Sequence, residues 1–116
     1  MGKLSTHILD TVHGGPAANV LIELYSMEPS PKLLVTVRTN ADGRTDAPLL
    51  KDADVKRGRY RLVFHVGEHF RSKGVPLPDP PFVDVVPIDF GIAEDGGSYH
   101  VPLVCSPWTY STSRGS

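Results

Sequence analysis

The chain has 116 residues, 40% of them hydrophobic and 22% charged, as expected of a single globular domain spanning residues 1–116. Twelve basic and thirteen acidic residues give a formal net charge of −1, which argues against nucleic-acid binding, and no stretch approaches the ~20 apolar residues of a membrane helix. Cys105 is the only cysteine and residues 1–6 contain no apolar run of the signal-peptide kind, so we expect a cytoplasmic protein without disulfides or membrane contact.

Eleven glycines and eleven prolines divide the sequence into short runs that alternate between apolar and polar side chains. In chain order the predicted strands are residues 4–9, 19–27, 32–39, 44–50, 59–66, 82–90, 98–105 and 108–113. Two of these strands contain Pro48 and Pro87, and because proline lacks a ladder donor we expect both at an edge or a bulge. Residues 40–43 predict a turn, and residues 67–74 predict one or two helical turns ending at Gly74. Seven or eight strands and one short helix predict an all-β sandwich or barrel.

Alternation assigns two histidines to the face opposite the core. In residues 98–105 the odd-numbered side chains are apolar, so His100 points away from the core, and His7 does the same in residues 4–9. The pattern alone leaves both as ordinary surface histidines or as members of a site. Cys105 falls on the apolar face, which favours a buried small hydrophobic residue over a nucleophile.

Other chemical motifs are weaker. His65 and His69 have the four-residue spacing of a helical metal pair, but this spacing straddles a predicted strand-to-helix junction and no third ligand has metal-site spacing. We therefore expect no metal and no organic cofactor. No G-x-S-x-G elbow is present, which argues against a serine hydrolase of that type.

Four segments carry a more specific signal: LSTHILDTVHGGPAANV at residues 4–20, TNADGR at 39–44, YHVPL at 99–103 and SPWTYSTSRGS at 106–116. Together they resemble the first two strands, the turn after the third strand, the seventh strand and the carboxyl end of the transthyretin-related family. The resemblance covers essentially the whole chain. It implies a transthyretin-like sandwich of two four-stranded sheets, with the first and seventh strands adjacent. It also implies a homotetramer, a dimer of dimers whose outer faces line a central channel.

The family has a carrier branch and a branch that hydrolyses 5-hydroxyisourate in urate breakdown. The hydrolase branch has histidine, arginine and histidine where this chain has His7, Arg44 and His100, whereas the carrier has lysine, glutamate and threonine. The resemblance thus implies ring opening of 5-hydroxyisourate to 2-oxo-4-hydroxy-4-carboxy-5-ureidoimidazoline. We expect the histidine pair to activate water, without choosing between its members, and Arg44 to polarise the substrate. The simpler role for Arg44 is a turn residue pairing with Asp42 or Asp46.

The carboxyl end departs from the hydrolase motif at one position. The motif is tyrosine-arginine-glycine-serine, and this chain has Ser113, Arg114, Gly115 and Ser116 there. The resemblance implies that these four residues bind substrate, with Arg114 and the Ser116 carboxylate closing the site, or else that Arg114 belongs to a solvated terminus. Ser113 resembles the carrier's threonine, so a ligand-binding protein with weak or no hydrolase activity is the alternative. A scaffold that docks a partner is a third hypothesis, but it leaves the two histidines and Arg44 unexplained.

Overall fold

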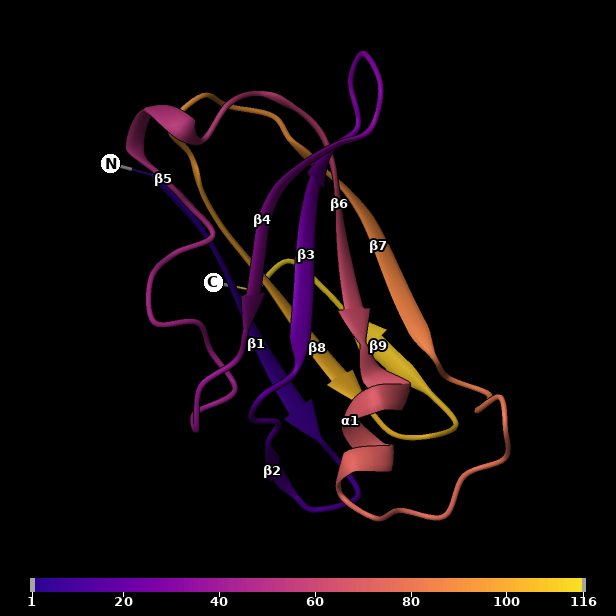
Figure 1. Cartoon of the computed structure of the whole chain (residues 1–116). Helices are drawn as coiled ribbons and strands as arrows, with labels where there is room; N and C mark the ends of the chain where they lie inside the picture. The colour runs from indigo at the N-terminus through magenta and orange to yellow at the C-terminus, as the bar shows by residue number, and fades with distance from the viewer. Residues whose placement is uncertain (1, 116) are drawn as a thin grey trace.

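Two β-sheets pack face to face and enclose the apolar side chains, with one short helix at the end of the sandwich (Figure 1). The structure is a computed structural model that describes residues 2–115. Its elements are β1 (Lys3–Asp10), β2 (Gly15–Pro16), β3 (Leu21–Ser26), β4 (Lys32–Arg38), β5 (Leu50–Lys51), the 3-10 helix η1 (Asp52–Asp54), β6 (Gly58–His65), α1 (Val66–Ser72), β7 (Val85–Ile92), β8 (Ser98–Cys105) and β9 (Tyr110–Thr112). Among the described residues, no helix has the length and apolar character needed to cross a membrane.

The order of strands confirms the predicted two-sheet sandwich. One sheet has the order β4-β3-β6-β7 and the other β2-β1-β8-β9. The second sheet has five strands rather than the expected four, because the two-residue strands β2 and β5 both pair with β1. The first and penultimate strands, β1 and β8, are neighbours as expected, and they run parallel while the other pairs run antiparallel.

The core lies between the sheets and follows the alternation of the strands. In β1 and β8 every second side chain is buried, so Leu4 and Ile8 of β1 and Leu103 of β8 lie inside the sandwich. Phe70 fixes α1 to this core because its ring is fully buried. Burying an aromatic or branched side chain of this kind contributes ~1.5–3 kcal/mol. The opposite faces of β1 and β8 are consequently left for partly exposed polar side chains.

The predicted strand at residues 44–50 is mostly wrong. Only Leu50 lies in a strand, and the preceding residues form a loop. Pro48 cannot donate to a ladder, and the loop's polar side chains bond locally, as Thr45 Oγ1 does to the carbonyl oxygen of Ala47 at 2.5 Å. The backbone N–H of Leu49 still reaches the Leu4 carbonyl oxygen at 2.8 Å. This loop therefore stays attached to β1 without forming a strand.

Candidate active site on the outer face of the β1–β8 pair

The parallel register of β1 and β8 decides which polar side chains meet on the outer face. Ser5 lies directly opposite His100, and His7 lies opposite Pro102. His7 and His100 therefore share the outer face at diagonal positions, two residues apart in register. Ser5 Oγ lies 2.8 Å from Nδ1 of His100, within hydrogen-bonding distance.

A pocket of about 500 Å³ opens on this face, a size that suits a small ligand. Its lining residues are Lys3, Ser5, Arg44, Ser98, Tyr99, His100, Arg114 and Gly115. The structure thus brings together Arg44, His100 and two residues of the carboxyl-terminal segment. The residues of this lining that were not predicted from the sequence are Lys3, Ser5, Ser98 and Tyr99. Alternation put Ser5 on the same face as His7, but only the register of the sheet shows that it faces His100.

Not every predicted site residue lines this pocket. His7 is half-buried on the same face but lies outside the lining residues, and Ser113 is exposed on the segment that follows β9. Ser116 lies outside the described residues. Two larger hollows occur elsewhere on the described chain, but their walls contain no histidine.

A tight turn carries Arg44 to the pocket. The Asn40 side chain accepts hydrogen bonds from the backbone N–H groups of Asp42 and Arg44, at 2.9 and 3.2 Å. Gly43 adopts a φ of +72°, and its carbonyl oxygen accepts a 2.9 Å hydrogen bond from the Ile8 N–H of β1. A Cβ at Gly43 would lie 2.5 Å from the Ile8 carbonyl oxygen, so the turn requires glycine.

The Arg44 side chain is not used to stabilise this turn. Within residues 2–115 its guanidinium makes no ion pair, and Asp46 instead accepts a 2.9 Å hydrogen bond from the Asn40 amide. The positive charge of Arg44 therefore remains available to the pocket that it lines.

The carboxyl-terminal segment is held against His100. The N–H of Gly115 donates to the His100 carbonyl oxygen at 2.7 Å, and a Cβ at Gly115 would lie only 2.7 Å from Cδ2 of the His100 ring. The Arg114 guanidinium lies 4.3 Å from the ring centroid of Tyr99 and donates to the Ser98 carbonyl oxygen at 3.2 Å. Arg114 is exposed but has defined contacts at the rim of the pocket.

The pocket is electropositive. Lys3, Arg44 and Arg114 contribute cations, and its lining residues include no carboxylate. Partial burial lowers the pKa of His100 below its usual value, and the nearby charges of Arg44, His7 and Lys3 lower it further. His100 is therefore neutral near pH 7 and can accept a proton beside groups that attract negative charge. This combination suits addition of water to a carbonyl group.

The other sequence candidates lie away from this pocket. His65 Nε2 lies 2.8 Å from Glu23, whereas His69 Nε2 lies 2.8 Å from Asp10, so the two rings bond to different carboxylates. Cys105 is buried as predicted, and burial raises the pKa of its thiol to about 12, with a smaller contribution from Asp10. Such a thiol is a poor nucleophile near neutral pH.

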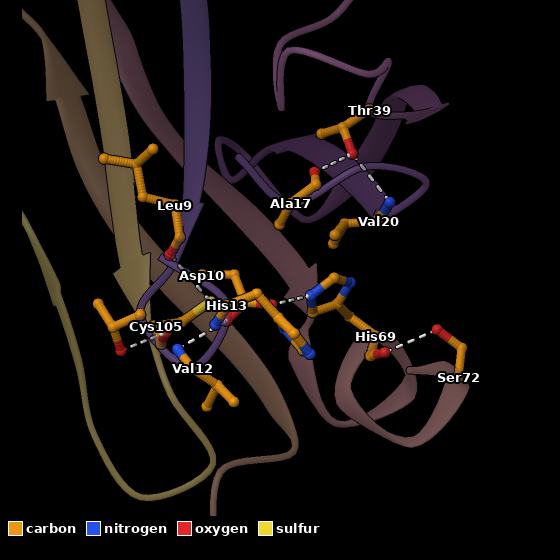
Figure 2. Close-up of polar contacts among 11 residues, drawn as sticks. Leu9, Asp10, Val12, His13, Ala17, Val20, Thr39, His69, Ser72 and Cys105 are labelled. Carbon is orange, nitrogen blue, oxygen red and sulfur yellow. Dashed lines mark hydrogen bonds and ion pairs between the residues drawn. The ribbon is translucent and has the colours of Figure 1, made fainter. Parts of the chain in front are cut away.

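A second polar cluster, missed from the sequence, joins Asp10, His13 and His69 at the end of β1 (Figure 2). Asp10 Oδ2 lies 2.6 Å from Nδ1 of His13 and 2.8 Å from Nε2 of His69, while Oδ1 accepts from the N–H groups of Val12 and His13. Metal-bound histidines normally donate their other ring N–H to an acceptor, but Nδ1 of His69 is buried without a partner among the described residues. We interpret this Asp10 cluster as a hydrogen-bonded connection between the β1–β2 loop and α1.

Comparison with known proteins agrees with this architecture. The model of the HIUase/Transthyretin family matches residues 4–115. The chain is similar to 5-hydroxyisourate hydrolase 2 of Rhizobium meliloti (strain 1021), with 53% identity over 99% of this chain and 97% of that protein.

Solved structures give the same result. The crystal structure of (S)-allantoin synthase matches with a TM-score of 0.95 and 42% identity, over 99% of this chain and 44% of that one. The structure of Klebsiella pneumoniae 5-hydroxyisourate hydrolase matches with a TM-score of 0.83 and 35% identity, over 100% of both chains. The chain therefore belongs to the HIUase/Transthyretin family.

Proposed function

We propose that the protein hydrolyses 5-hydroxyisourate to 2-oxo-4-hydroxy-4-carboxy-5-ureidoimidazoline in urate degradation, with residues 1–116 acting as one catalytic domain. The relatives named 5-hydroxyisourate hydrolase support the reaction, since one from Ralstonia nicotianae is 50% identical over the full length of both chains. The observation that carries the proposal is that His100 and Arg44 line one pocket, where burial and the nearby Arg44 charge hold the pKa of His100 below its usual value.

The mechanism uses the histidine pair as base and the arginines as electrostatic partners. A neutral imidazole takes a proton from water while the water oxygen adds to the carbonyl carbon of the substrate ring. The carbonyl oxygen gains negative charge, which Arg44 stabilises because guanidinium stays protonated and presents planar donors. The C–N bond of the cyclic amide then breaks, and the imidazolium returns the proton to the leaving nitrogen. A positioned base of this kind contributes ~10²–10⁴-fold.

We assign the remaining residues to substrate binding. Arg114 lies on Tyr99 at the rim of the pocket, and in this proposal its guanidinium binds polar oxygens of the substrate. Gly115 allows the terminal segment to pass close to His100. In this proposal Ser116 also binds substrate, and the short hydroxyl of Ser113 stands where the hydrolase motif has the longer phenol of a tyrosine.

The proposal includes a cytoplasmic homotetramer, a dimer of dimers. Exposed aromatic side chains support association, because Phe82 and Trp108 are 75% and 60% exposed and stack with ring centroids 6.1 Å apart. A tetramer would enclose the outer face of β1 and β8, and His7 would then border a channel between subunits. Sedimentation velocity of the purified protein tests the tetramer.

A small-ligand binding protein is the second candidate. Ser113 favours it, since this serine replaces the hydrolase tyrosine and is exposed in the structure. In that case calorimetry would detect binding of a small planar heterocycle without turnover.

The deciding experiment is a direct assay. Freshly prepared 5-hydroxyisourate is mixed with purified protein, and the loss of its absorbance is compared with the uncatalysed decay. We expect acceleration by the native protein and loss of most of it in His7→Ala or His100→Ala. The base assignment is wrong if both variants keep the native rate, and the hydrolase proposal is wrong if the native protein does not accelerate the decay.

A further inference from the structure

We propose that Ser5 is a positioning residue for the reaction, because its hydroxyl holds Nδ1 of His100 and leaves Nε2 as the nitrogen that takes the proton from water. The inference rests on the proposed function and refines it, since it selects one nitrogen of one histidine.

The fold places the Ser5 hydroxyl at this point. Ser5 and His100 occupy directly opposed positions of the parallel strands β1 and β8, although they are 95 residues apart in the sequence. The distance of 2.8 Å between Ser5 Oγ and His100 Nδ1 is that of a hydrogen bond between partly buried groups. Within residues 2–115, Ser5 is the only side chain that bonds to the His100 ring.

A second contact restricts the same ring from its other edge. The backbone of Gly115 passes close to Cδ2 of this ring. A Cβ at Gly115 would lie 2.7 Å from Cδ2, so a side chain at this position would displace the ring or the segment. Nδ1 and Cδ2 lie on opposite edges of the imidazole, so the ring is held at Nδ1 by Ser5 and bordered at Cδ2 by the carboxyl-terminal segment. A half-turn of the ring about the Cβ–Cγ bond would exchange Nδ1 and Cδ2 and break the contact with Ser5, and the ring that is held in this way lines the pocket.

The chemistry follows from the charge state of the ring. The pKa of His100 lies below its usual value because of burial and the nearby Arg44, His7 and Lys3, so near pH 7 the ring carries a single proton. When Ser5 Oγ accepts from an N–H at Nδ1, the lone pair of Nε2 is free to act as base. The hydroxyl hydrogen of Ser5 then remains available for an oxygen of the bound substrate, which adds to the preference for this tautomer.

Removal of the hydroxyl tests this assignment. We expect Ser5→Ala to lower kcat by about 10- to 100-fold with a smaller change in KM, because the base loses orientation rather than the substrate losing its charged partners. Ser5→Thr keeps the hydroxyl and suits a strand, so it should recover most of the rate. Ser30→Ala removes an exposed serine in the loop before β4 and should behave as the native protein.

Nitrogen NMR of the His100 ring provides a readout that needs no turnover. At neutral pH the native protein and Ser5→Thr should show a protonated Nδ1 and an unprotonated Nε2, and Ser5→Ala should gain the other tautomer. An unprotonated Nδ1 in the native protein, or identical tautomers and identical kcat in native protein and Ser5→Ala, would overturn the proposal. Absence of hydrolase activity in a native protein with the expected tautomer would refute the proposed function instead.

Discussion

The N–H of Gly115 donates a 2.7 Å hydrogen bond to the His100 carbonyl oxygen, and the Gly115 backbone lies against the edge of the same residue's ring. A Cβ at this position would be 2.7 Å from Cδ2, shorter than real Cβ contacts. Gly115→Ala must therefore move the terminal segment or the imidazole. We expect a fall in kcat/KM of about 100-fold, because a displacement of ~1 Å at a reacting group has an effect of that order.

Gly91→Ala is the matched control for this substitution. Gly91 lies in β7, where an added Cβ would meet no atom within 4 Å, so the variant should keep the native rate. Initial rates with 5-hydroxyisourate measure both variants, and thermal unfolding shows whether each is folded. Native activity in Gly115→Ala would mean that the close approach of this segment has no part in the reaction.

The second prediction concerns pH. Partial burial, and then the charges of Arg44, His7 and Lys3, lower the pKa of His100, so the acid limb of kcat/KM should lie below the ordinary histidine value of ~6.5. Lys3→Gln removes one cation and makes protonation of His100 easier. The limb should therefore move to higher pH in Lys3→Gln and stay unchanged in Lys32→Gln, whose lysine lies in β4 of the other sheet. If the acid limb does not move in Lys3→Gln, the limb does not report the titration of His100.

The third prediction concerns the Asp10 cluster. Asp10 and His69 are each 2% exposed, whereas His13 is 46% exposed. Asp10→Ala removes four hydrogen-bond contacts and leaves a ring N–H of His69 buried, so we expect a loss of about 2–4 kcal/mol in the free energy of unfolding. His13→Ala should cost ~1 kcal/mol or less, because its bond is open to water. Urea denaturation at pH 7 compares the two variants, and equal losses would contradict this assignment of the buried pair.

The same cluster predicts how stability depends on acid. Burial alone would raise the pKa of Asp10, but the hydrogen bond from His69, followed by those from His13, outweighs it and leaves the pKa below its ordinary value. A carboxyl group of this kind contributes stability above its unfolded pKa and loses that contribution as the pH falls through its folded pKa. The native protein should therefore lose stability below about pH 4 more steeply than Asp10→Asn, as measured by urea midpoints across that range.

The fourth prediction concerns the position that departs from the hydrolase motif. Ser113 is exposed and does not line the pocket, whereas the next two residues do. A phenol reaches several ångströms further than a serine hydroxyl, so it could contact the substrate from this position. We expect Ser113→Tyr to raise kcat in the absorbance assay. A rate that is unchanged or lower would show that the missing phenol does not limit the reaction.

Some of this structure could be predicted because local alternation determines it. β8 coincides with the predicted strand at residues 98–105, since its apolar side chains alternate without interruption. The same rule predicted a histidine on the outer face of each of the two strands. The prediction of a strand at residues 44–50 was wrong because Pro48 and local side-chain hydrogen bonds outweigh a short apolar pattern. β2 was missed because two residues have no periodicity.

The contacts that define the site could not be predicted in this way. Ser5 faces His100 because of the register between two strands, and period-two alternation says nothing about register between segments 95 residues apart. The Asp10 cluster likewise depends on packing α1 against the end of β1. A resemblance to a family indicated which residues belong together, but it did not indicate that Lys3 and Tyr99 line the same pocket.

The parallel pairing of β1 with β8 also has a consequence during synthesis. β3, β4 and β6 can pair while later residues are still being added, because their partners follow one another closely along the chain. β1 is synthesised before the other strands of its sheet, and its partner β8 is synthesised about 90 residues later, so the edge of β1 that pairs with β8 stays open while the intervening strands are made. The pocket itself cannot exist until residue 115 has emerged, and a nascent chain halted earlier would expose β1 to other chains.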